Sequence, residues 1–460
     1  MQSIVVVGAS LAGLSAARAL RTAGYSGRLI VIGEEKHDPY DRPPLSKDFL
    51  AGRQEAVDLS LTIPSDGALD LEWRLGERAT GLRPRPGGGY LVDLEGGEPV
   101  EADGVVIATG ARARQLPDRS NPPADPGLLA DPSAARPAGG SGALRGVHTL
   151  RTLDDALALR AELVPGARLV VVGGGFIGAE IASTARELGV NVTLVELAAT
   201  ALAGPLGEEL GAVFAALHVA RGVNVLTGVG VDGLIPAAPA AAEADSDVGS
   251  AVDGSTGQAG SAGQAGPAGG VAGRLAAVRL ADGRELPADV VLVGIGSIPN
   301  TEWLAGSGVV GAGPDGDLRG GVRISPNGET NLPDVVATGD CAAGYSRFAS
   351  RVVRYEHWTN ALQHPALAAA ALLGVPAPKQ PASAGVPYFW SDQYGLKLQF
   401  AGHYHPGDVV EIVEGDVDQH CFAAVYRRDG EPVAVLSIGL PRVFARWRKH
   451  LATEPSSDTT

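Results

Sequence analysis

A strand–glycine turn–helix–strand pattern occurs twice in this chain. The first copy begins with a β-branched run over residues 4–7, continues through a glycine turn and an Ala- and Leu-rich stretch, and ends with an apolar run over residues 29–32. The second copy begins at residues 169–172, passes through three glycines starting at Gly173, and ends at residues 192–196. Each copy is typical of a βαβ unit with buried parallel strands. Two copies predict two dinucleotide-binding domains in one chain.

Each copy is closed by a further apolar run, over residues 105–110 and 290–296. Between the opening and the closing runs, residues 89–94 and 275–280 alternate apolar and polar side chains, as antiparallel strands with one exposed face do. We therefore expect an α/β fold of two Rossmann-like dinucleotide-binding domains, each with a β-meander insertion.

The rest of the chain divides into smaller parts. Residues 331–340 predict a strand with a turn, and residues 359–373 predict a helix. Residues 386–451 alternate aromatic, apolar and polar side chains, which predicts a small C-terminal domain of mixed α+β type. The predicted boundaries are 1–116 and 298–384 for the first domain, 147–297 for the second, 385–452 for the C-terminal domain, 117–146 for a Pro/Gly-rich linker and 453–460 for a polar tail.

One segment of the second domain has a low-complexity composition. Residues 237–273 consist mainly of Ala, Gly, Ser, Pro, Gln and acids, without Leu, Ile or aromatic residues. Such a segment cannot bury enough apolar surface to offset the entropy of ordering it. We expect a mobile surface insertion within the meander, and a regulatory docking loop is the alternative.

Composition excludes several classes of function. A net charge of −15 disfavours nucleic acid or an anionic membrane as the main partner. No apolar run reaches the ~20 residues of a membrane span, and no basic residue precedes the apolar run at the N-terminus, as an export signal requires.

Two cysteines are too few for a disulfide framework or a structural zinc site. His403 and His405 have no third ligand at a suitable spacing, so we expect no metal. We expect a soluble cytoplasmic protein.

The first glycine turn is suited to a dinucleotide. Glycines in such a turn let the backbone approach a pyrophosphate at the helix N-terminus, and an acid after the second strand binds the adenosine ribose. Gly8 and Gly13 keep the outer positions, and Ser10 takes the place of the middle glycine. Glu34 is the predicted ribose ligand, with Glu35 as the alternative.

The second turn keeps all its glycines and is followed by Glu196 at the strand end. Leu197 and two alanines come next, so no Arg is present to receive a 2′-phosphate, which a carboxylate would also repel. The prediction is NAD(H) rather than NADP(H). The alternative for either turn is that its glycines only pack a helix on a strand. The residues predicted to line the NAD site are Gly173, Gly175, Ile177, Gly178, Glu196 and Gly296.

Two dinucleotides in one chain imply that electrons pass between them. A nicotinamide gives two electrons as a hydride, whereas many acceptors take one electron at a time. A flavin mediates between two-electron and one-electron transfer. The first site is therefore predicted to hold FAD.

Several further motifs follow in a fixed order. Residues 40–47 are Tyr-Asp-Arg-Pro-Pro-Leu-Ser-Lys, residues 108–110 Ala-Thr-Gly, residues 338–340 Thr-Gly-Asp, residues 356–358 Glu-His-Trp and residues 389–395 Phe-Trp-Ser-Asp-Gln-Tyr-Gly. With the two glycine turns, they make the chain resemble the FAD-dependent ferredoxin reductases of the putidaredoxin reductase and biphenyl dioxygenase reductase type, which share the glutathione reductase fold. The resemblance covers nearly the whole chain outside the linker and the insertion.

The resemblance implies roles for individual residues. Lys47 would lie close to the flavin and pair with Glu180 from the helix after the second glycine turn, and a cation there stabilises a reduced flavin. Asp340 would bind the ribityl chain, and Trp358 would pack beside the isoalloxazine. The catalytic residues implied are Lys47, Glu180 and Trp358. The residues implied to line the FAD site are Gly8, Ser10, Gly13, Glu34, Arg42, Lys47, Ala108, Thr109, Gly110, Asp340 and Trp358.

The resemblance also implies an NADH:ferredoxin oxidoreductase. Electrons would pass from NADH through FAD to a small acidic iron–sulfur ferredoxin, or a rubredoxin, that feeds a monooxygenase or dioxygenase. The protein would be a monomer or homodimer. No Cys-x-x-Cys occurs, which excludes the disulfide reductases of this fold, and Cys341 is expected to be a small buried residue.

Two basic clusters are candidates for steering an acidic partner, or are merely solvated faces. They are Arg442, Arg446, Arg448, Lys449 and His450, and Arg347, Arg351 and Arg354. Alternative functions are an NADH oxidase or rubredoxin reductase, and an NADH-sensing binding flavoprotein similar to apoptosis-inducing factor.

Overall fold

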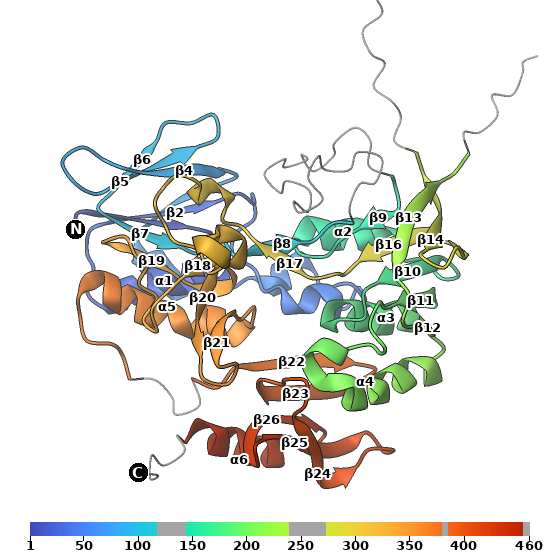
Figure 1. Ribbon diagram of the computed structural model, residues 1–460. Coiled ribbons are helices and arrows are strands. Elements are labelled where there is room, and N and C mark those ends of the chain that lie inside the picture. Colours follow the sequence, from blue (N-terminus) through green and yellow to red (C-terminus); the bar gives the residue numbers. More distant parts are fainter. Residues whose placement is uncertain (117–143, 239–272, 380–384, 454–460) are drawn as a thin grey trace, which may run out of the picture.

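The computed structural model describes residues 1–116, 144–238, 273–379 and 385–453. Two α/β modules lie next to each other, the first in blue and orange and the second mainly in green, with a C-terminal domain in red below them in the view of Figure 1. Most of the predicted linker, the low-complexity insertion and the polar tail lie outside the described residues. No helix in the described ranges is long and apolar enough to cross a membrane.

The first module contains a parallel sheet with the strand order β19-β7-β1-β2-β3. Side chains of the central strand alternate between two cores. Ile4 and Val6 pack with the helices on one face, and Val5 and Val7 pack with the meander on the other. The elements are β1 (Ser3–Val7), α1 (Leu11–Thr22), β2 (Arg28–Gly33), β3 (Leu71–Leu75), β7 (Gly104–Ile107), β19 (Val335–Ala337) and α5 (Trp358–Leu373), with the meander β4 (Ala79–Pro84), β5 (Tyr90–Leu94) and β6 (Val100–Ala102).

The second module repeats this arrangement with the strand order β12-β11-β10-β16-β9. Leu169 and Val171 of its central strand pack with helices, and Val170 and Val172 pack with the meander. The predicted duplication is therefore confirmed. The elements are β9 (Val147–His148), α2 (Leu153–Glu162), β10 (Arg168–Val172), α3 (Phe176–Glu187), β11 (Asn191–Val195), α4 (Ala203–Ala220), β12 (Asn224–Leu226) and β16 (Val290–Val293), with the meander β13 (Val231–Pro236), β14 (Leu275–Leu280) and β15 (Glu285–Pro287).

The C-terminal domain is an antiparallel sheet with the order β22-β23-β26-β25-β24 and one helix. Its apolar face packs against α4 of the second module, where Phe214 and Leu217 share a core with Phe400 and Tyr426. The predicted α+β character is confirmed. The elements are β22 (Tyr388–Gln393), β23 (Leu396–Gly402), β24 (Val409–Asp416), β25 (Cys421–Arg428), β26 (Glu431–Ile438) and α6 (Pro441–Ala452).

Two features join the modules and position the site. Antiparallel strands β8 (Ala111–Ala113) and β17 (Ser297–Pro299) cross from one module to the other. Leu45 and Phe49, which follow β2, are buried in the core of the second module with Ile181. The short strands β18 (Val322–Arg323), β20 (Ala342–Ser346) and β21 (Arg351–Arg354) complete the first module.

Candidate active site

The first glycine turn packs directly against the end of β7. Gly8 has a φ of +122°, and a Cβ atom there would lie 2.1 Å from the carbonyl oxygen of Ala108. A Cβ atom at Gly13 would lie 1.8 Å from the carbonyl oxygen of Gly8. Both positions therefore require glycine, because the backbone approaches too closely for a side chain. The turn lies at the carboxyl ends of the parallel strands, where dinucleotides bind in such sheets.

The N-terminus of α1 is suited to an anion. Its first turn contains no acid, and the side chain of Ser10 makes no capping hydrogen bond. Nε of Arg42 lies 3.3 Å from Oγ of Ser10, and Nη1 of Arg42 donates to the carbonyl oxygen of Arg151 at 2.6 Å. Arg151 pairs with the Asp340 carboxylate at 2.5 Å. A helix N-terminus beside two arginines fits the pyrophosphate of FAD.

Sequence reasoning missed Arg151. The residue precedes α2, and its backbone N–H donates to the carboxylate of Asp155, which belongs to a capping box with Thr152. That capping box is the local sequence feature that could have drawn attention to Arg151. The contact of Arg151 with Asp340 spans 189 residues, so no local pattern predicts it.

The two acids after β2 have different partners. Glu35 accepts hydrogen bonds from Tyr40 and Arg42. The side chain of Glu34 is 70% exposed, and its ion pair with Arg78 is long, at 3.7 Å. The carboxylate of Glu34 is therefore available to a ribose, whereas that of Glu35 is already engaged. This difference favours Glu34 as the FAD ribose ligand.

Lys47 and Glu180 form an ion pair between the two modules. Nζ of Lys47 lies 2.6 Å from Oε2 of Glu180, and the two side chains are 16% and 3% exposed. Oε2 of Glu180 also accepts from Oγ of Ser46 at 2.6 Å, and Oε1 accepts from Oγ of Ser391 at 2.7 Å and from the backbone N–H of Asp392 at 3.3 Å. The pairing implied by the resemblance is thus present. The two serine partners were missed, although both belong to quoted motifs.

Trp358, the first residue of α5, is held beside this pair. Its indole Nε1 donates to Oδ1 of Asp41 at 2.7 Å, and its ring meets that of Trp390 edge-on with centroids 6.0 Å apart. Burial raises the pKa of Asp41, against the lowering effects of Trp358 and Lys47. The Asp41 carboxylate therefore accepts a hydrogen bond from Trp358 and also feels the charge of Lys47.

The end of β7 is connected to the crossing strands. Oγ1 of Thr109 donates to the carbonyl oxygen of Asn300 at 2.6 Å, and the backbone N–H of Asn300 donates to the carbonyl oxygen of Gly110 at 3.0 Å. Gly296, at the other end of β17, is next to Ser297, whose hydroxyl donates to Glu356. The predicted residues 108–110 and Gly296 thus lie at opposite ends of one strand that joins the modules.

The second glycine turn has the same geometry as the first. A Cβ atom at Gly173, where φ is +101°, would lie 2.4 Å from the carbonyl oxygen of Gly294, and one at Gly178 would lie 2.1 Å from the carbonyl oxygen of Gly173. At Gly175 and Gly296 a Cβ atom would meet nothing within 4 Å. The turn therefore packs tightly on one side and leaves open space on the other, which fits a bound dinucleotide.

Glu196 closes this second turn. Its Oε2 accepts from the backbone N–H of Gly174 at 2.6 Å, and its Oε1 accepts from that of Ala198 at 2.7 Å. The carboxylate therefore lies at the glycine turn itself. Leu197, the next residue, is 73% exposed, and Ile177 in the first turn of α3 is 45% exposed. An acid at the glycine turn, followed by an exposed leucine, fits the adenosine ribose of NAD(H).

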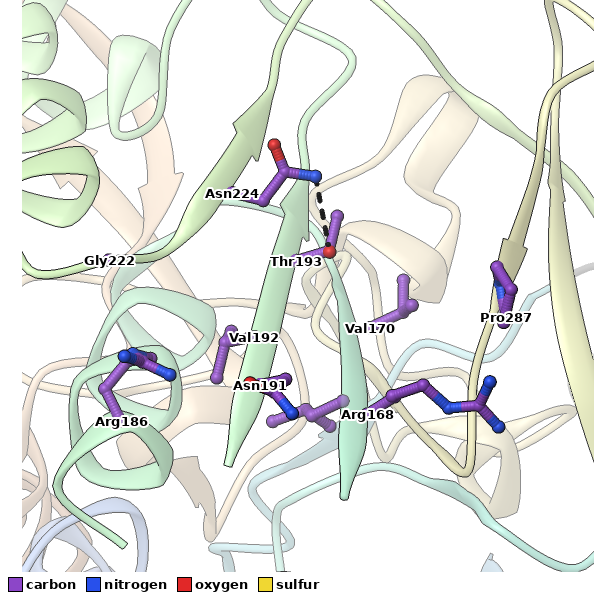
Figure 2. Close-up of a pocket in the computed structure, with 10 residues that line it drawn as sticks. Arg168, Val170, Arg186, Asn191, Val192, Thr193, Gly222, Asn224 and Pro287 are labelled. Carbon is purple, nitrogen blue, oxygen red and sulfur yellow. Dashed lines mark hydrogen bonds between the residues drawn. The ribbon is translucent and has the colours of Figure 1, made fainter. Parts of the chain in front are cut away.

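A hollow elsewhere in the second module is not part of this site. Figure 2 shows it with Arg168, Asn191 and Asn224, the first residues of β10, β11 and β12, and with Thr193 of β11. The guanidinium of Arg168 is occupied by Asp289, at 2.7 Å. Because dinucleotides bind at the carboxyl ends of parallel strands, this hollow lies at the wrong edge of the sheet for a cofactor.

Other predicted residues fall outside the cofactor sites. Cys341 is fully buried and its Sγ lies 3.3 Å from the carbonyl oxygen of Thr338, so the expected buried role is confirmed. The rings of His403 and His405 lie 5.2 Å apart. Within the described ranges, no group of three or more His, Cys, Asp or Glu side chains is placed to hold a metal ion.

Comparisons with known proteins agree with this architecture. A model of the pyridine nucleotide-disulphide oxidoreductase family matches residues 2–364, and a model of the reductase C-terminal domain matches residues 388–460. Putidaredoxin reductase of Pseudomonas putida is 32% identical over 460 residues, which cover 99% of this chain and 93% of that protein. The ferredoxin–NAD(+) reductase component of the biphenyl dioxygenase system of Paraburkholderia xenovorans is 34% identical over 441 residues, which cover 95% of this chain and 87% of the component.

A solved structure extends the match to three dimensions. The covalent putidaredoxin reductase–putidaredoxin complex matches with a TM-score of 0.79 and 31% identity, over 98% of this chain and 93% of that one. The duplicated modules, the C-terminal sheet and the full-length similarity all agree. The chain belongs to the pyridine nucleotide-disulphide oxidoreductase family, among the FAD-dependent ferredoxin reductases of the putidaredoxin reductase and biphenyl dioxygenase reductase type.

Proposed function

We propose that this chain is an NADH:ferredoxin oxidoreductase that uses FAD. It passes electrons from NADH to a small iron–sulfur ferredoxin, which in turn serves a monooxygenase or a dioxygenase. Relatives that match nearly the whole chain are ferredoxin reductase components of oxygenase systems, and a matching solved structure contains a reductase joined to its redox partner. FAD, when bound, supplies the chemistry that turns a two-electron hydride donor into a source of single electrons.

The observation that carries the proposal is the buried ion pair of Lys47 and Glu180. Lys47 belongs to the FAD module and Glu180 to the helix that begins at the second glycine turn, so the pair marks where the two cofactor sites meet. A fixed ammonium group at that point stabilises negative charge that develops on a reduced ring system. Glu180 holds the ammonium group in place and compensates its charge.

The remaining residues hold the cofactors. Arg42, Arg151 and the N-terminus of α1 would bind the FAD pyrophosphate, and Glu34 would bind its ribose. Asp340, which Arg151 orients, would accept from the ribityl hydroxyls. Trp358, fixed by Asp41, would pack against the flavin and exclude water from it.

The second site would select NADH. Glu196 accepts two backbone hydrogen bonds at the glycine turn, and the exposed side chain that follows it is a leucine. A 2′-phosphate would meet a carboxylate and no arginine from residues 197–199. NADH, whose adenosine ribose has free hydroxyls, is therefore preferred over NADPH.

An acidic ferredoxin suits the basic surface beside the site. Arg347 and Arg351 are exposed and lie near β21, which leads into Trp358. On a chain with a net charge of −15, such local basic groups would steer an acidic partner towards the flavin edge. Both cysteines are unpaired, which agrees with a cytoplasmic location.

The test is electron delivery without oxygen. We would follow the visible absorbance of a small, acidic [2Fe–2S] ferredoxin mixed with the FAD-loaded protein and NADH at low and high salt. The expected result is rapid ferredoxin reduction that slows as the salt concentration rises. In a parallel run in air, rapid oxidation of NADH by oxygen at a rate unchanged by ferredoxin would contradict the proposal and favour an NADH oxidase.

A further inference from the structure

A line of buried polar side chains extends from Glu180 away from the cofactor sites. Oε1 of Glu180 accepts from Oγ of Ser391 at 2.7 Å, and Oγ of Ser391 accepts from Nε2 of Gln393 at 3.1 Å. At the far end, His218 of α4 is hydrogen-bonded through Nδ1 to the hydroxyl of Tyr394 at 2.7 Å. Glu180, Ser391, Gln393 and His218 are each at most 2% exposed. Neither the resemblance nor the proposed mechanism gives His218 or Gln393 a role.

Two unpartnered atoms mark the middle of this line. Nε2 of His218 and Oε1 of Gln393 are both buried, and neither has a hydrogen-bond partner among the described residues. One is a potential donor and the other an acceptor. The side chain of Gln393 raises the pKa of His218, against the larger lowering effect of burial. The simplest way to satisfy both atoms is a hydrogen bond between them.

The polarity of the line is uniform once this bond is included. The hydroxyl of Tyr394 would donate to Nδ1 of His218, and Nε2–H of His218 would donate to Oε1 of Gln393. Gln393 donates to Ser391, and Ser391 donates to Glu180. Every donor therefore points towards the Glu180 carboxylate, which Lys47 faces from the other side. Hydrogen bonds in one direction polarise one another and stabilise a negative charge at the end of the line.

We propose that His218, Gln393 and Ser391 are positioning residues that fix the Glu180 carboxylate, and so hold Lys47 in place for the reaction. This role rests on the proposed function, because it assigns the purpose of the line to the Lys47–Glu180 pair. The line orients and does not conduct protons, since an amide such as Gln393 retains both of its N–H protons. His218 must be neutral, with its proton on Nε2.

The backbone at the far end of the line is held in a costly conformation. Tyr394 and Gly395 form the turn between β22 and β23, with φ values of +54° and +76°. A left-handed conformation is unfavourable for a tyrosine, and Asn, Asp or Gly usually occupies that position. The backbone N–H of Tyr394 donates to Oγ of Ser183 at 2.8 Å, and its ring lies 5.3 Å from the guanidinium of Arg221. These contacts fix the hydroxyl that aligns His218.

The first test reads the His218 ring in the cofactor-free protein. In a two-bond ¹⁵N–¹H spectrum of ¹⁵N-histidine-labelled protein at pH 7, the signal lost in His218→Leu identifies the ring among nine histidines. We expect a neutral ring with Nε2 protonated, and we expect Glu180→Gln to move its signals while those of His148, which pairs with Glu162, stay in place. A ring protonated on Nδ1, or signals insensitive to Glu180→Gln, would overturn the proposal.

The second test measures reduction of bound flavin by NADH in a rapid-mixing experiment. Breaking the line with His218→Leu or Gln393→Leu should slow reduction about 5- to 10-fold, equivalent to the net contribution of one ordinary hydrogen bond. The double variant should be no slower than either single variant. His218→Gln, whose amide can both accept and donate, should recover most of the rate, whereas a purely structural role would not distinguish it from leucine.

The control is His148→Leu, which removes an imidazole from the same module without touching the line. Unchanged reduction rates in both line variants, with folding intact, would overturn the proposal. A failure of NADH to reduce even the wild-type flavin would instead contradict the proposed function, while the ring measurement would still decide whether the line exists.

Discussion

At the scale of single residues, the site depends on how charged groups are compensated. The Glu180 carboxylate accepts hydrogen bonds from Lys47, Ser46, Ser391 and the backbone of Asp392. A carboxylate so deeply buried is stable only when all of its lone pairs have partners. Glu180 is therefore at once a structural joint between modules and the counter-charge of the proposed catalytic lysine.

Replacement of Lys47 with alanine tests this double role. Flavin reduction by NADH should slow by about 10- to 100-fold, equivalent to the loss of one well-placed charge. Stability should fall by about 3–5 kcal/mol because Glu180 remains buried without its partner. Rapid-mixing absorbance and urea unfolding would measure the two effects.

Adding Glu180→Gln to Lys47→Ala should restore stability without restoring the rate. The matched control is Lys397→Ala, since Lys397 is exposed and pairs only loosely with Asp392, at 3.4 Å. A normal reduction rate in Lys47→Ala would remove Lys47 from the mechanism.

Replacement of Glu196 with alanine should weaken NADH binding while FAD stays bound. Loss of the carboxylate proposed to bind the ribose is expected to raise the KM for NADH about tenfold. Steady-state kinetics and the flavin content of the purified protein check both parts. Glu285→Ala, which removes an exposed acid of the same module, serves as the control. Unchanged NADH kinetics in Glu196→Ala would contradict the assignment of the second site.

At the scale of elements, helix α3 connects all three parts of the molecule. Glu180, Ser183 and Thr184 lie on one face of it, because positions three and four apart are neighbours on a helix. Ser183 accepts from the backbone of Tyr394, and Thr184 donates to the carbonyl oxygen of Ser46. The helix itself follows from the glycine turn and the apolar spacing. The partners of its polar face cannot be predicted from these local patterns, because Glu180 and Ser391 are separated by 211 residues.

The hairpin of β13 and β14 provides an element-scale prediction. The backbone N–H of Ala237 donates to the carbonyl oxygen of Arg274 at 2.7 Å, so the two strands are still paired where residues 239–272 begin and end. Replacement of residues 239–272 by a short Asn-Gly turn should leave the melting temperature within about 2 °C. NADH kinetics should also be unchanged. Differential scanning calorimetry and steady-state assays would check this, and a loss of activity would support the alternative of a docking loop.

At the scale of the whole molecule, local patterns were enough to predict the two modules. The glycine turns, the acids at strand ends and the period-2 alternation each act over fewer than about 30 residues. The resemblance added the pairing of Lys47 with Glu180. Arg151, Gln393 and His218 could not be predicted, because their partners come from other modules and are set by how the sheets and helices pack.

Stability should fall as the solution becomes mildly acidic. Burial lowers the pKa of both His218 and His357 to about 4, whereas an unfolded histidine titrates near 6.5. Between these values the unfolded chain binds protons that the folded chain does not, so stability is full above about pH 6.5 and is lost as pH falls towards 4. For His218 the loss is about 3 kcal/mol.

Urea unfolding at pH 7.5 and pH 5 would measure most of this loss, about 2 kcal/mol for His218. Carboxylates such as Asp289, whose pKa is lowered to about 2 by hydrogen bonding to Arg168, lose their contribution only below about pH 4. The pH range in which the histidines lose their contribution to stability is therefore separate from the range in which the carboxylates lose theirs. Equal free energies of unfolding at pH 7.5 and pH 5 would show that the histidines are not buried in the neutral form.

The central claim is that two cofactor sites meet at the Lys47–Glu180 pair and pass electrons from NADH to FAD. The most direct test is an anaerobic titration of the FAD-loaded protein with NADH and, separately, with NADPH, followed by the visible flavin absorbance. We predict that NADH bleaches the flavin rapidly and stoichiometrically, and that NADPH does so at least tenfold more slowly. A protein that binds no flavin, or a flavin that NADH does not bleach, would contradict the account.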